Sequence, residues 1–416
     1  MSTRSIPIAA VAESAAGADW RDVAHWMRPG TLQLQGLPPL SLYIHLPWCL
    51  RKCPYCDFNS HEWGANSGEL PELVYLNALQ ADLVSALPLI WGRAVHTVFI
   101  GGGTPSLFSP AGIERLLNDV RALLPLVPDA EITLEANPGT FEKDRFRAYR
   151  SAGVTRLSIG VQSFSDAHLE AIGRIHNGAQ ARAAVAEAAE CFDTFNLDLM
   201  YALPGQTLAQ LQADLATALS FAPPHLSVYH LTLEPNTYFA KYPPALPPED
   251  EAWDMLDAIT AGTAAAGLQR YEVSAYARAG HRCGHNQNYW QFGDYLGIGA
   301  GAHSKLSFAH RIMRQVRLRD PRRYMEGAAR GDAVAQTEAV KRSELPFEFM
   351  LNALRLCDGF SLKDFAATTG LPLSTIDAPI KKASASGWLV LDGDWVRPTE
   401  RGFDLLSDVQ SLFLPD

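Results

Sequence analysis

Three cysteines lie close together in this sequence at a spacing that can hold iron. They belong to the Cys-x₃-Cys-x₂-Cys motif Cys49-Leu50-Arg51-Lys52-Cys53-Pro54-Tyr55-Cys56. Three thiolates on one short loop can bind three irons of a [4Fe–4S] cluster and leave the fourth iron without a protein ligand. Such an iron is useful only when another molecule must bind it. The motif therefore predicts a cluster held by Cys49, Cys53 and Cys56, with one iron open to a ligand.

Three other roles for these cysteines agree less well with the sequence. A structural zinc site closes with four ligands, and a fourth would have to come from a distant segment. A redox pair of Cys53 and Cys56 would leave Cys49 without a role. Covalent haem attachment needs a histidine directly after the Cys-x-x-Cys pair, where Asp57 stands instead. The chain has six cysteines in 416 residues, too few for a disulfide scaffold, and the other three are scattered: Cys191, Cys283 and Cys357.

Short β-rich runs alternate with longer helical stretches from residue 41 onward, and these elements must position the cysteines. The predicted strands are Ser41–Leu46, Val95–Ile100, Glu131–Ala136, Arg156–Val161, Asn196–Met200 and Leu226–Leu233. One intervening helix is predicted from an apolar face of Leu73, Leu76, Leu79, Leu83 and Leu87, and another covers Ala179–Glu190. Six βα units in succession predict an α/β fold, most economically an open (β/α)₆ barrel.

Residues able to bind a ligand should gather at one edge of this sheet, because ligand sites in parallel α/β folds lie at the carboxyl ends of the strands. The cysteines follow the first predicted strand, and Gly101-Gly102-Gly103-Thr104-Pro105 follows the second. Glu135 ends the third strand, Gln162 follows the fourth, and Asp198 lies in the fifth. Glycines allow the backbone to approach a ligand closely, although a tight strand-to-helix turn would also use them. The spacing thus predicts one shared site.

The segment around the cysteines resembles the radical S-adenosylmethionine (SAM) enzymes. The resemblance rests on Tyr43-Ile44-His45-Leu46-Pro47-Trp48-Cys49 and Cys56-Asp57-Phe58-Asn59, and it covers the chain from about Leu40 to the C-terminus. Within that superfamily the chain is similar to the group that contains oxygen-independent coproporphyrinogen III oxidase and the HemW-type haem chaperones. The resemblance implies that the open iron binds the amino and carboxylate groups of SAM. An electron from the cluster then cleaves SAM to methionine and a 5′-deoxyadenosyl radical.

The resemblance also implies a set of residues that bind SAM. Gly102, Gly103 and Thr104 match positions for its methionine moiety, and further family positions are matched by Tyr43, Glu135, Gln162, Arg174 and Asp198. Carboxylates and amides accept hydrogen bonds from an ammonium group and ribose hydroxyls, and arginine binds a carboxylate. Considered alone, Tyr43 fits a core strand and Arg174 a solvated helix. The motif of the fifth strand departs from the family at Ala202, where glycine is usual, so we expect a slightly altered backbone there.

Two features distinguish a haem chaperone from an oxidase within this group. The oxidases carry a further cysteine two residues beyond the third ligand, whereas this chain has Phe58 there, as HemW-type proteins do. The second feature is a stretch that resembles the HemW haem-binding motif, His285-Asn286-Gln287-Asn288-Tyr289-Trp290. Imidazole is a good axial ligand of haem iron, and aromatic rings can cover a porphyrin. The resemblance therefore implies His285 as the haem ligand, with Cys283 as an alternative. Without it, His285 would be interpreted as a hydrogen-bonded residue of a surface loop, and Cys283 as a buried structural cysteine.

The resemblance implies a haem-binding chaperone that carries the cluster and SAM and delivers haem to haem-requiring proteins such as respiratory proteins. Its SAM chemistry would be vestigial or regulatory, would need an electron donor, and would not include coproporphyrinogen oxidase activity. The alternative is an enzyme, oxygen-independent coproporphyrinogen III oxidase. In that enzyme the 5′-deoxyadenosyl radical abstracts hydrogen from a propionate side chain before CO₂ is lost.

Composition and charge disfavour several other classes of protein. The formal net charge of −10 is unsuited to nonspecific binding of nucleic acid or anionic lipid. No apolar run is expected to reach the roughly 18 residues of a membrane-spanning helix. Ile6–Ala12 resembles the core of a signal peptide, but it is short and Arg4 is its only basic neighbour. We therefore expect a cytoplasmic protein without an integral membrane segment, in which the clustered thiols stay reduced.

Four segments are predicted along the chain. Residues 1–39 are expected to form a disordered N-terminal extension, 40–245 the radical SAM core, and 246–335 a helical and irregular connection that holds the haem motif. Residues 336–416 are expected to form a winged-helix-like α+β domain with helices at 346–356, 361–368 and 374–386 and a hairpin turning at Asp392-Gly393-Asp394. Its candidate recognition face offers only Lys381 and Lys382, which disfavours DNA binding.

Overall fold

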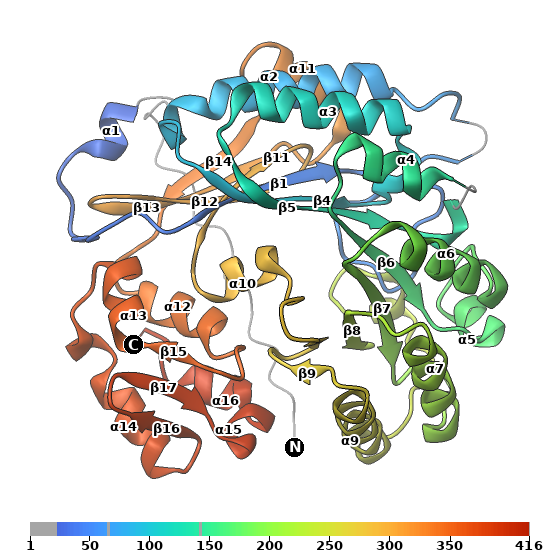
Figure 1. Ribbon diagram of the computed structural model, residues 1–416. Coiled ribbons are helices and arrows are strands. Elements are labelled where there is room, and N and C mark those ends of the chain that lie inside the picture. The colour runs from blue at the N-terminus through green and yellow to red at the C-terminus, as the bar shows by residue number, and fades with distance from the viewer. Residues whose placement is uncertain (1–22, 65–66, 141–143, 416) are drawn as a thin grey trace.

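One large sheet forms the centre of the computed structural model, which describes residues 23–64, 67–140 and 144–415 (Figure 1). Within these residues twelve strands pair in the order β14-β13-β12-β11-β1-β4-β5-β6-β7-β8-β10-β9. The six strands from β1 to β8 in this order are parallel. They are β1 (Leu40–Leu46), β4 (Val95–Gly102), β5 (Leu126–Ala136), β6 (Arg156–Gln162), β7 (Phe195–Tyr201) and β8 (His225–His230). The predicted α/β fold with six parallel strands is confirmed.

Helices cover the convex face of this sheet (Figure 1). They are α2 (Glu72–Ile90), α3 (Pro110–Leu123), α4 (Arg145–Ala152), α5 (Asp166–Ala171), α6 (Gly178–Cys191), α7 (Leu208–Ser220) and α11 (Pro321–Ala329). Successive strand side chains point to opposite faces of a sheet. In β5, for example, Ile132 and Leu134 are buried in the apolar core shared with the helices, whereas Thr133 and Glu135 line a cavity. One face of β5 therefore packs against the helices, and the other face lines the cavity.

Helix α2 is long and apolar enough to cross a membrane by length and composition alone, although half of its apolar window is buried inside the protein. This differs from the expectation that no segment reaches that length, because Asn77, Gln80 and Asp82 interrupt the apolar residues without lowering their average enough. The buried face is centred on Tyr75, Leu79 and Leu83, while Leu73 is 64% exposed. The prediction that Leu73 belongs to the apolar face is therefore wrong.

The sheet continues on both sides beyond the six predicted strands. Strand β11 (Asp294–Ile298) pairs in parallel with β1, and β12 (His303–Phe308), β13 (Arg311–Arg317) and β14 (Val334–Ala339) follow in antiparallel order. At the other edge β10 (Ala275–Ala277) and β9 (Gln269–Arg270) join β8. Much of the connection expected to be irregular is thus part of the sheet. Strand β14 also runs across the boundary predicted at residue 335.

The concave side of the sheet holds α10 (Gly284–Trp290) and faces the C-terminal domain (Figure 1). That domain contains α12 (Leu345–Ala353), α13 (Leu362–Thr369), α14 (Asp377–Ala385), the hairpin of β16 (Leu389–Asp392) and β17 (Trp395–Pro398), a short third strand β15 (Phe360–Ser361), and then α15 (Glu400–Asp404) and α16 (Leu406–Ser411). Ser361 caps α13 as predicted, since its Oγ accepts from the Lys363 N–H at 3.1 Å. The predicted order of three helices and a hairpin is confirmed.

Residues 23–39 are packed onto the protein, so the expectation of disorder is wrong for this part. Trp26 lies in helix α1 (Val23–Met27), is 4% exposed and stacks on Phe308 at 5.9 Å between ring centroids. Leu32 is buried, and its N–H donates to the carbonyl of His310 at 3.3 Å. Buried apolar side chains offset the entropy cost of ordering this segment. Residues 1–22 lie outside the described residues.

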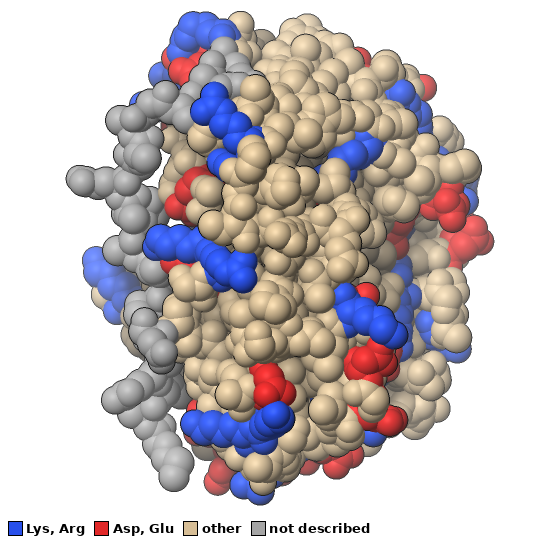
Figure 2. Space-filling view, turned by 90° about the vertical axis from the view of Figure 1, so that its left-hand side faces the viewer, with Lys and Arg blue, Asp and Glu red and all other residues tan. Residues whose placement is uncertain are grey.

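Surface charges of both signs are interspersed on the face shown in Figure 2. On α14, the Lys381 ammonium pairs with the Asp377 carboxylate at 2.6 Å. One of the two basic residues considered for a DNA contact is thereby partly neutralised. That the protein has no nucleic-acid partner stays a prediction.

Candidate functional site

The cysteine loop is closed by backbone pairing at its base. Cys49 ends β2 (Trp48–Cys49), which pairs in parallel with β3 (His61–Glu62). The Lys52 ammonium donates to the carbonyls of Phe58 and Ser60 at 3.1 and 3.3 Å and so ties the loop to itself. Cys49, Cys53 and Cys56 are free, partly exposed, and line one cavity of about 430 Å³.

The geometry of the three thiols bears on the choice between one metal ion and a cluster. Among the described residues, no three His, Cys, Asp or Glu side chains are arranged to hold a metal ion. A [4Fe–4S] cubane instead takes each thiolate on a separate iron. Burial raises the pKa of the Cys49 and Cys56 thiols, and the neighbouring cysteines add to the rise. Bound iron would supply the positive charge that favours the thiolates.

The glycine motif packs against the cysteine loop. The N–H groups of Gly103 and Thr104 donate to the carbonyls of Leu46 and Trp48, each at 2.8 Å. A Cβ on Gly103 would lie 2.6 Å from the Trp48 carbonyl oxygen, and Gly102 has φ +117° beside the His45 ring. Glycine is therefore required here because the motif lies close to other atoms of the protein. Gly102, Gly103 and Thr104 nevertheless line the cavity beside the cysteines.

Polar side chains at alternate positions of neighbouring strands form the cavity wall. The predicted residues Glu135, Gln162 and Asp198 all lie there. The sequence prediction missed others on the same wall: Thr133, Arg156, Ser158, Asn196, His225 and Ser227. These precede the predicted residues by two, four or six positions or repeat that pattern on β8. The two-residue period of a strand could have found them.

The Asp198 and Glu135 carboxylates lie close enough for their negative charges to oppose each other. The Asp198 carboxylate accepts from Asn196 Nδ2 at 2.7 Å and from Ser158 Oγ at 3.1 Å. The Glu135 carboxylate accepts from the Gly102 N–H at 3.0 Å. Burial, then the nearby Asp198 charge, raises the pKa of Glu135 to about 7, and burial also raises the pKa of Asp198. A ligand with a cationic group and hydroxyl donors would relieve this unfavourable pairing.

Arg174 lies beside the cysteine loop and does not occupy a solvated helix position. One guanidinium nitrogen donates to the Gly160 carbonyl at 2.7 Å, and the other faces the Cys53 sulfur at 3.6 Å. Its Nε is buried and has no hydrogen-bond partner within the described residues. The arginine thus places a positive charge between the cysteines and the strand ends, where it could meet a thiolate or a ligand carboxylate.

Two strand ends at the site have unusual backbone conformations. Gln162 has φ +67° at an irregularity in the β6–β7 pairing, and Ala202 has φ +54°. The conformation that favours glycine is therefore kept at position 202 although the residue is alanine. A left-handed conformation costs an alanine about 1–2 kcal/mol.

Tyr43 is in the barrel interior and does not line the cavity. Its hydroxyl donates to His45 Nδ1 at 2.9 Å, and its ring lies 6.3 Å from the Phe99 ring. Burial raises the pKa of Tyr43, so the phenol is neutral. A contact from Tyr43 to SAM stays a prediction.

His285 lies in the first turn of α10 inside the barrel, so the interpretation as a surface loop is wrong. It is 2% exposed, stacks on Phe99 at 4.9 Å and does not line the cavity. Its Nδ1 lies 3.1 Å from the Thr97 hydroxyl, while the buried Nε2 has no partner among the described residues. Burial lowers the pKa of His285 to about 3. The ring is closed to solvent, and a role as haem ligand stays a prediction.

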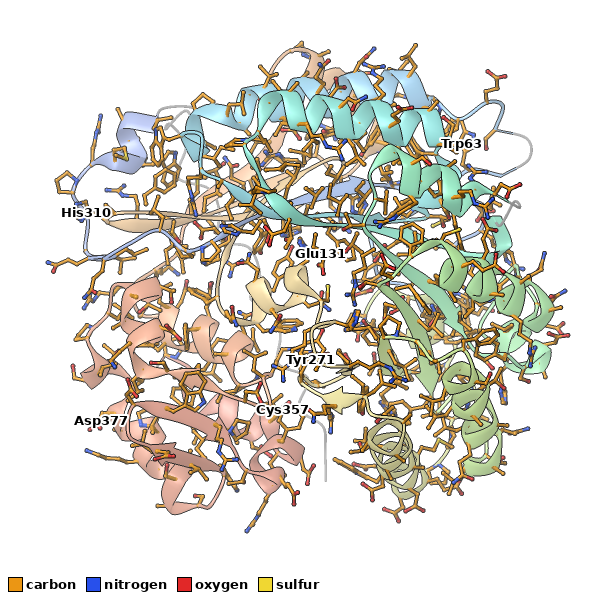
Figure 3. All side chains as sticks on the ribbon, in the orientation of Figure 1. Trp63, Glu131, Tyr271, His310, Cys357 and Asp377 are labelled. Carbon is orange, nitrogen blue, oxygen red and sulfur yellow. The ribbon has the colours of Figure 1, made fainter. Side chains whose placement is uncertain are left out.

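Glu131 holds the start of α10 in place between β5 and the helix (Figure 3). Its carboxylate accepts from the N–H groups of Gly284 and His285, each at 3.2 Å, and lies 3.7 Å from Arg156. The Cys283 thiol is 3.5 Å from the same carboxylate, and burial raises the pKa of Cys283 to about 12. Cys283 is therefore a neutral thiol that lines the cavity floor. Cys357 lies elsewhere, next to Tyr271, to whose carbonyl its N–H donates at 3.0 Å.

Comparisons with known proteins agree with this geometry. The Radical SAM superfamily profile matches residues 43–218, and the HemN C-terminal domain profile matches residues 340–405. A protein named "Heme chaperone HemW" from Escherichia coli (strain K12) is 48% identical over 382 residues, which cover 91% of this chain and 99% of that protein. This chain belongs to the HemW family. A second member from Bacillus subtilis (strain 168), with the same name, is 35% identical over 90% of this chain and 99% of its own length.

A solved structure shares the fold over nearly the whole length. It is coproporphyrinogen III oxidase (HemN) from Escherichia coli, described as a radical SAM enzyme, with a TM-score of 0.77 and 25% identity. The match covers 91% of this chain and 90% of that one. The HemW family member described here and this oxidase therefore have the same arrangement of a radical SAM barrel and a C-terminal domain.

Proposed function

We propose that this chain holds a [4Fe–4S] cluster through Cys49, Cys53 and Cys56 and binds SAM in the cavity next to them. The observation that carries the proposal is that three thiols share one cavity with Arg174 and two partly buried carboxylates. Arg174 would meet the SAM carboxylate, while Glu135 and Asp198 would accept from its ammonium and ribose hydroxyls. When bound, the cluster supplies an electron for cleavage of SAM.

The remaining predicted SAM contacts would line the same ligand. Gly102, Gly103 and Thr104 present backbone to the cavity beside the cysteines, and Gln162 presents an amide at the end of β6. Tyr43 would act from behind this wall through His45, to which it is hydrogen-bonded. Together these groups are spread over the carboxyl ends of neighbouring parallel strands, where ligands of such sheets bind.

The biological role that we propose is that of a cytoplasmic haem chaperone, which binds haem and delivers it to haem-requiring proteins such as respiratory proteins. Relatives over 91% of the chain bear the name of haem chaperones. Phe58, where the oxidases carry a cysteine, lines the cavity and is 60% exposed. A reducing compartment suits the exposed thiols, and an electron donor would be needed to reduce the cluster.

The second candidate function is coproporphyrinogen III oxidase, favoured by the structural match to HemN over 91% of the chain. One anaerobic experiment separates the two functions. The reconstituted protein is incubated with coproporphyrinogen III, SAM and a reductant, while a parallel sample is titrated with haem. A chaperone gives stoichiometric haem binding and no protoporphyrinogen IX. Robust decarboxylation would overturn the chaperone and support the oxidase.

A further inference from the structure

The histidines that line a cavity are few among the described residues, and only one of them offers a free imidazole. His225 and His230 line the cavity of the cysteines. Both ring nitrogens of His225 are engaged, with Asn196 Oδ1 at 2.6 Å and with the Tyr271 hydroxyl at 2.9 Å. His230 is exposed, and no hydrogen bond to its ring is found within the described part of the chain. Among the described residues, His230 is therefore the cavity-lining histidine whose imidazole is both exposed and without a hydrogen-bond partner.

A second cavity of about 340 Å³ is also lined by His230. This residue contributes to both linings, so the second cavity adjoins the cysteine site at His230. The wall of the second cavity is mainly apolar and comes from β7, from the chain before α9 (Glu249–Ala265), and from α9 itself. Its main apolar contributors are Tyr201, Leu246, Pro247, Trp253 and Leu256, and its acidic residue is Glu249.

The sheet fixes the position of the His230 ring. His230 is the register partner of Tyr201 across β7 and β8, and their ring centroids are 5.0 Å apart. The Leu231 N–H donates to the Tyr201 carbonyl at 3.0 Å directly after the strand. A side chain that binds a metal is positioned more accurately on a strand than on a loop. Partial burial lowers the pKa of His230 below its usual value, which favours the neutral ring with a free lone pair.

We propose that the second cavity is a haem-binding site in which His230 is an axial ligand of the iron. The imidazole lone pair would bind the iron, and Tyr201 and Trp253 would contact the porphyrin face. Trp253 is 43% exposed, so the cavity opens to solvent and a bound haem would remain partly accessible. A chaperone must release its haem to another protein, and release requires that the bound haem be accessible from solvent. The inference rests on the proposed haem-chaperone function and names the residue that serves it.

The test is a haem titration of the full-length reconstituted protein, followed by the Soret band. His230→Ala should shift the band and weaken binding by about tenfold or more, and added imidazole should restore the original spectrum by replacing the lost ligand. Trp253→Ala, on the exposed wall, should weaken binding without changing the ligand-dependent position of the band. His96→Ala is the matched control, because His96 is exposed and lines neither cavity.

The outcomes separate this inference from the function on which it rests. If the wild type binds haem and His230→Ala leaves both spectrum and affinity unchanged, the site is wrong while the chaperone function stands. A spectral shift in His285→Ala instead would place the iron at α10. If the wild type binds no haem, both proposals fail. Circular dichroism of each variant shows that a lost signal is not due to unfolding.

Discussion

Replacing Gly103 with alanine tests whether the glycine motif holds the cysteine loop. The added Cβ would lie 2.6 Å from the Trp48 carbonyl oxygen and 2.8 Å from the carbonyl carbons of Pro47 and Trp48. These are backbone atoms and cannot rotate away. To reach an ordinary contact of 3.4 Å, the loop must retreat from 2.6 Å by roughly 0.8 Å. Cys49 directly follows Trp48 and would move with it.

The same shift breaks the hydrogen bonds that join the motif to the loop. The Gly103 and Thr104 N–H bonds are 2.8 Å long, and lengthening them by about 0.8 Å takes them outside hydrogen-bond range. Each such bond contributes about 1 kcal/mol net. We therefore expect Gly103→Ala to lower the free energy of unfolding by about 2–3 kcal/mol and to reduce cluster assembly, since cluster ligands need placement to within about 0.5 Å.

Urea unfolding and iron and sulfide analysis after anaerobic reconstitution measure the two effects. Gly205→Ala is the matched control, because Gly205 has φ +67° but nothing within 4 Å of its added Cβ. This substitution should lower the free energy of unfolding by about 1–2 kcal/mol through backbone strain alone and leave the cluster intact. A Gly103→Ala protein with wild-type stability and a full cluster would refute the reasoning. The close approach at Gly103 would then serve only a bound ligand.

Three further predictions concern the cluster, SAM and pH. Alanine at Cys49, Cys53 or Cys56 should abolish the cluster in iron analysis and Mössbauer spectra, whereas Cys191→Ala should not; tight zinc in place of iron would contradict this. Asp198→Ala should weaken SAM binding by about 1.5–3 kcal/mol, because it removes a charged acceptor. The readout is the effect of SAM on the EPR signal of the reduced cluster, and no effect in the wild type would exclude an open iron. The folded-state pKa of Glu135, about 7, lies above its usual 4.5, so ionisation costs the folded state stability. The free energy of unfolding of the wild type, measured relative to Glu135→Gln, should therefore fall as pH rises from 4.5 to about 7 and stay constant above that. A difference in urea unfolding that does not change with pH would show that the folded protein does not raise the pKa of Glu135.

Local sequence was sufficient for the parallel core and for the residues at the strand ends of the site. Six β-rich runs separated by helices predicted β1 to β8, because strand and helix periodicities are written in consecutive residues. The carboxyl ends of parallel strands share one edge, so Glu135, Gln162 and Asp198 could be placed together with the cysteines without coordinates. Arg174 was placed there by family resemblance alone, since its own neighbours predict a solvated position.

Other features depended on contacts between distant segments. Strand β11 is short and followed by Gly299 and Gly301, and it is a strand because β1 offers an edge for pairing. Trp26 is ordered because Phe308 lies against it. Without the family resemblance, residues 285–290 indicated a surface loop, whereas Glu131 caps α10 and Phe99 stacks on His285 inside the barrel.

The sequence by itself determined which residues can form a cluster loop and that they meet the strand ends, because both follow from spacing along one chain. Only the tertiary structure decided which imidazole is accessible. His230 and His285 are both histidines beside aromatic residues, and nothing in their neighbouring residues shows which of the two rings is exposed. Their burial depends on what other elements pack against them: α10 is enclosed by the barrel, whereas His230 at the end of β8 lines two cavities. Solvent access is a property of the assembled fold, and local sequence does not encode it.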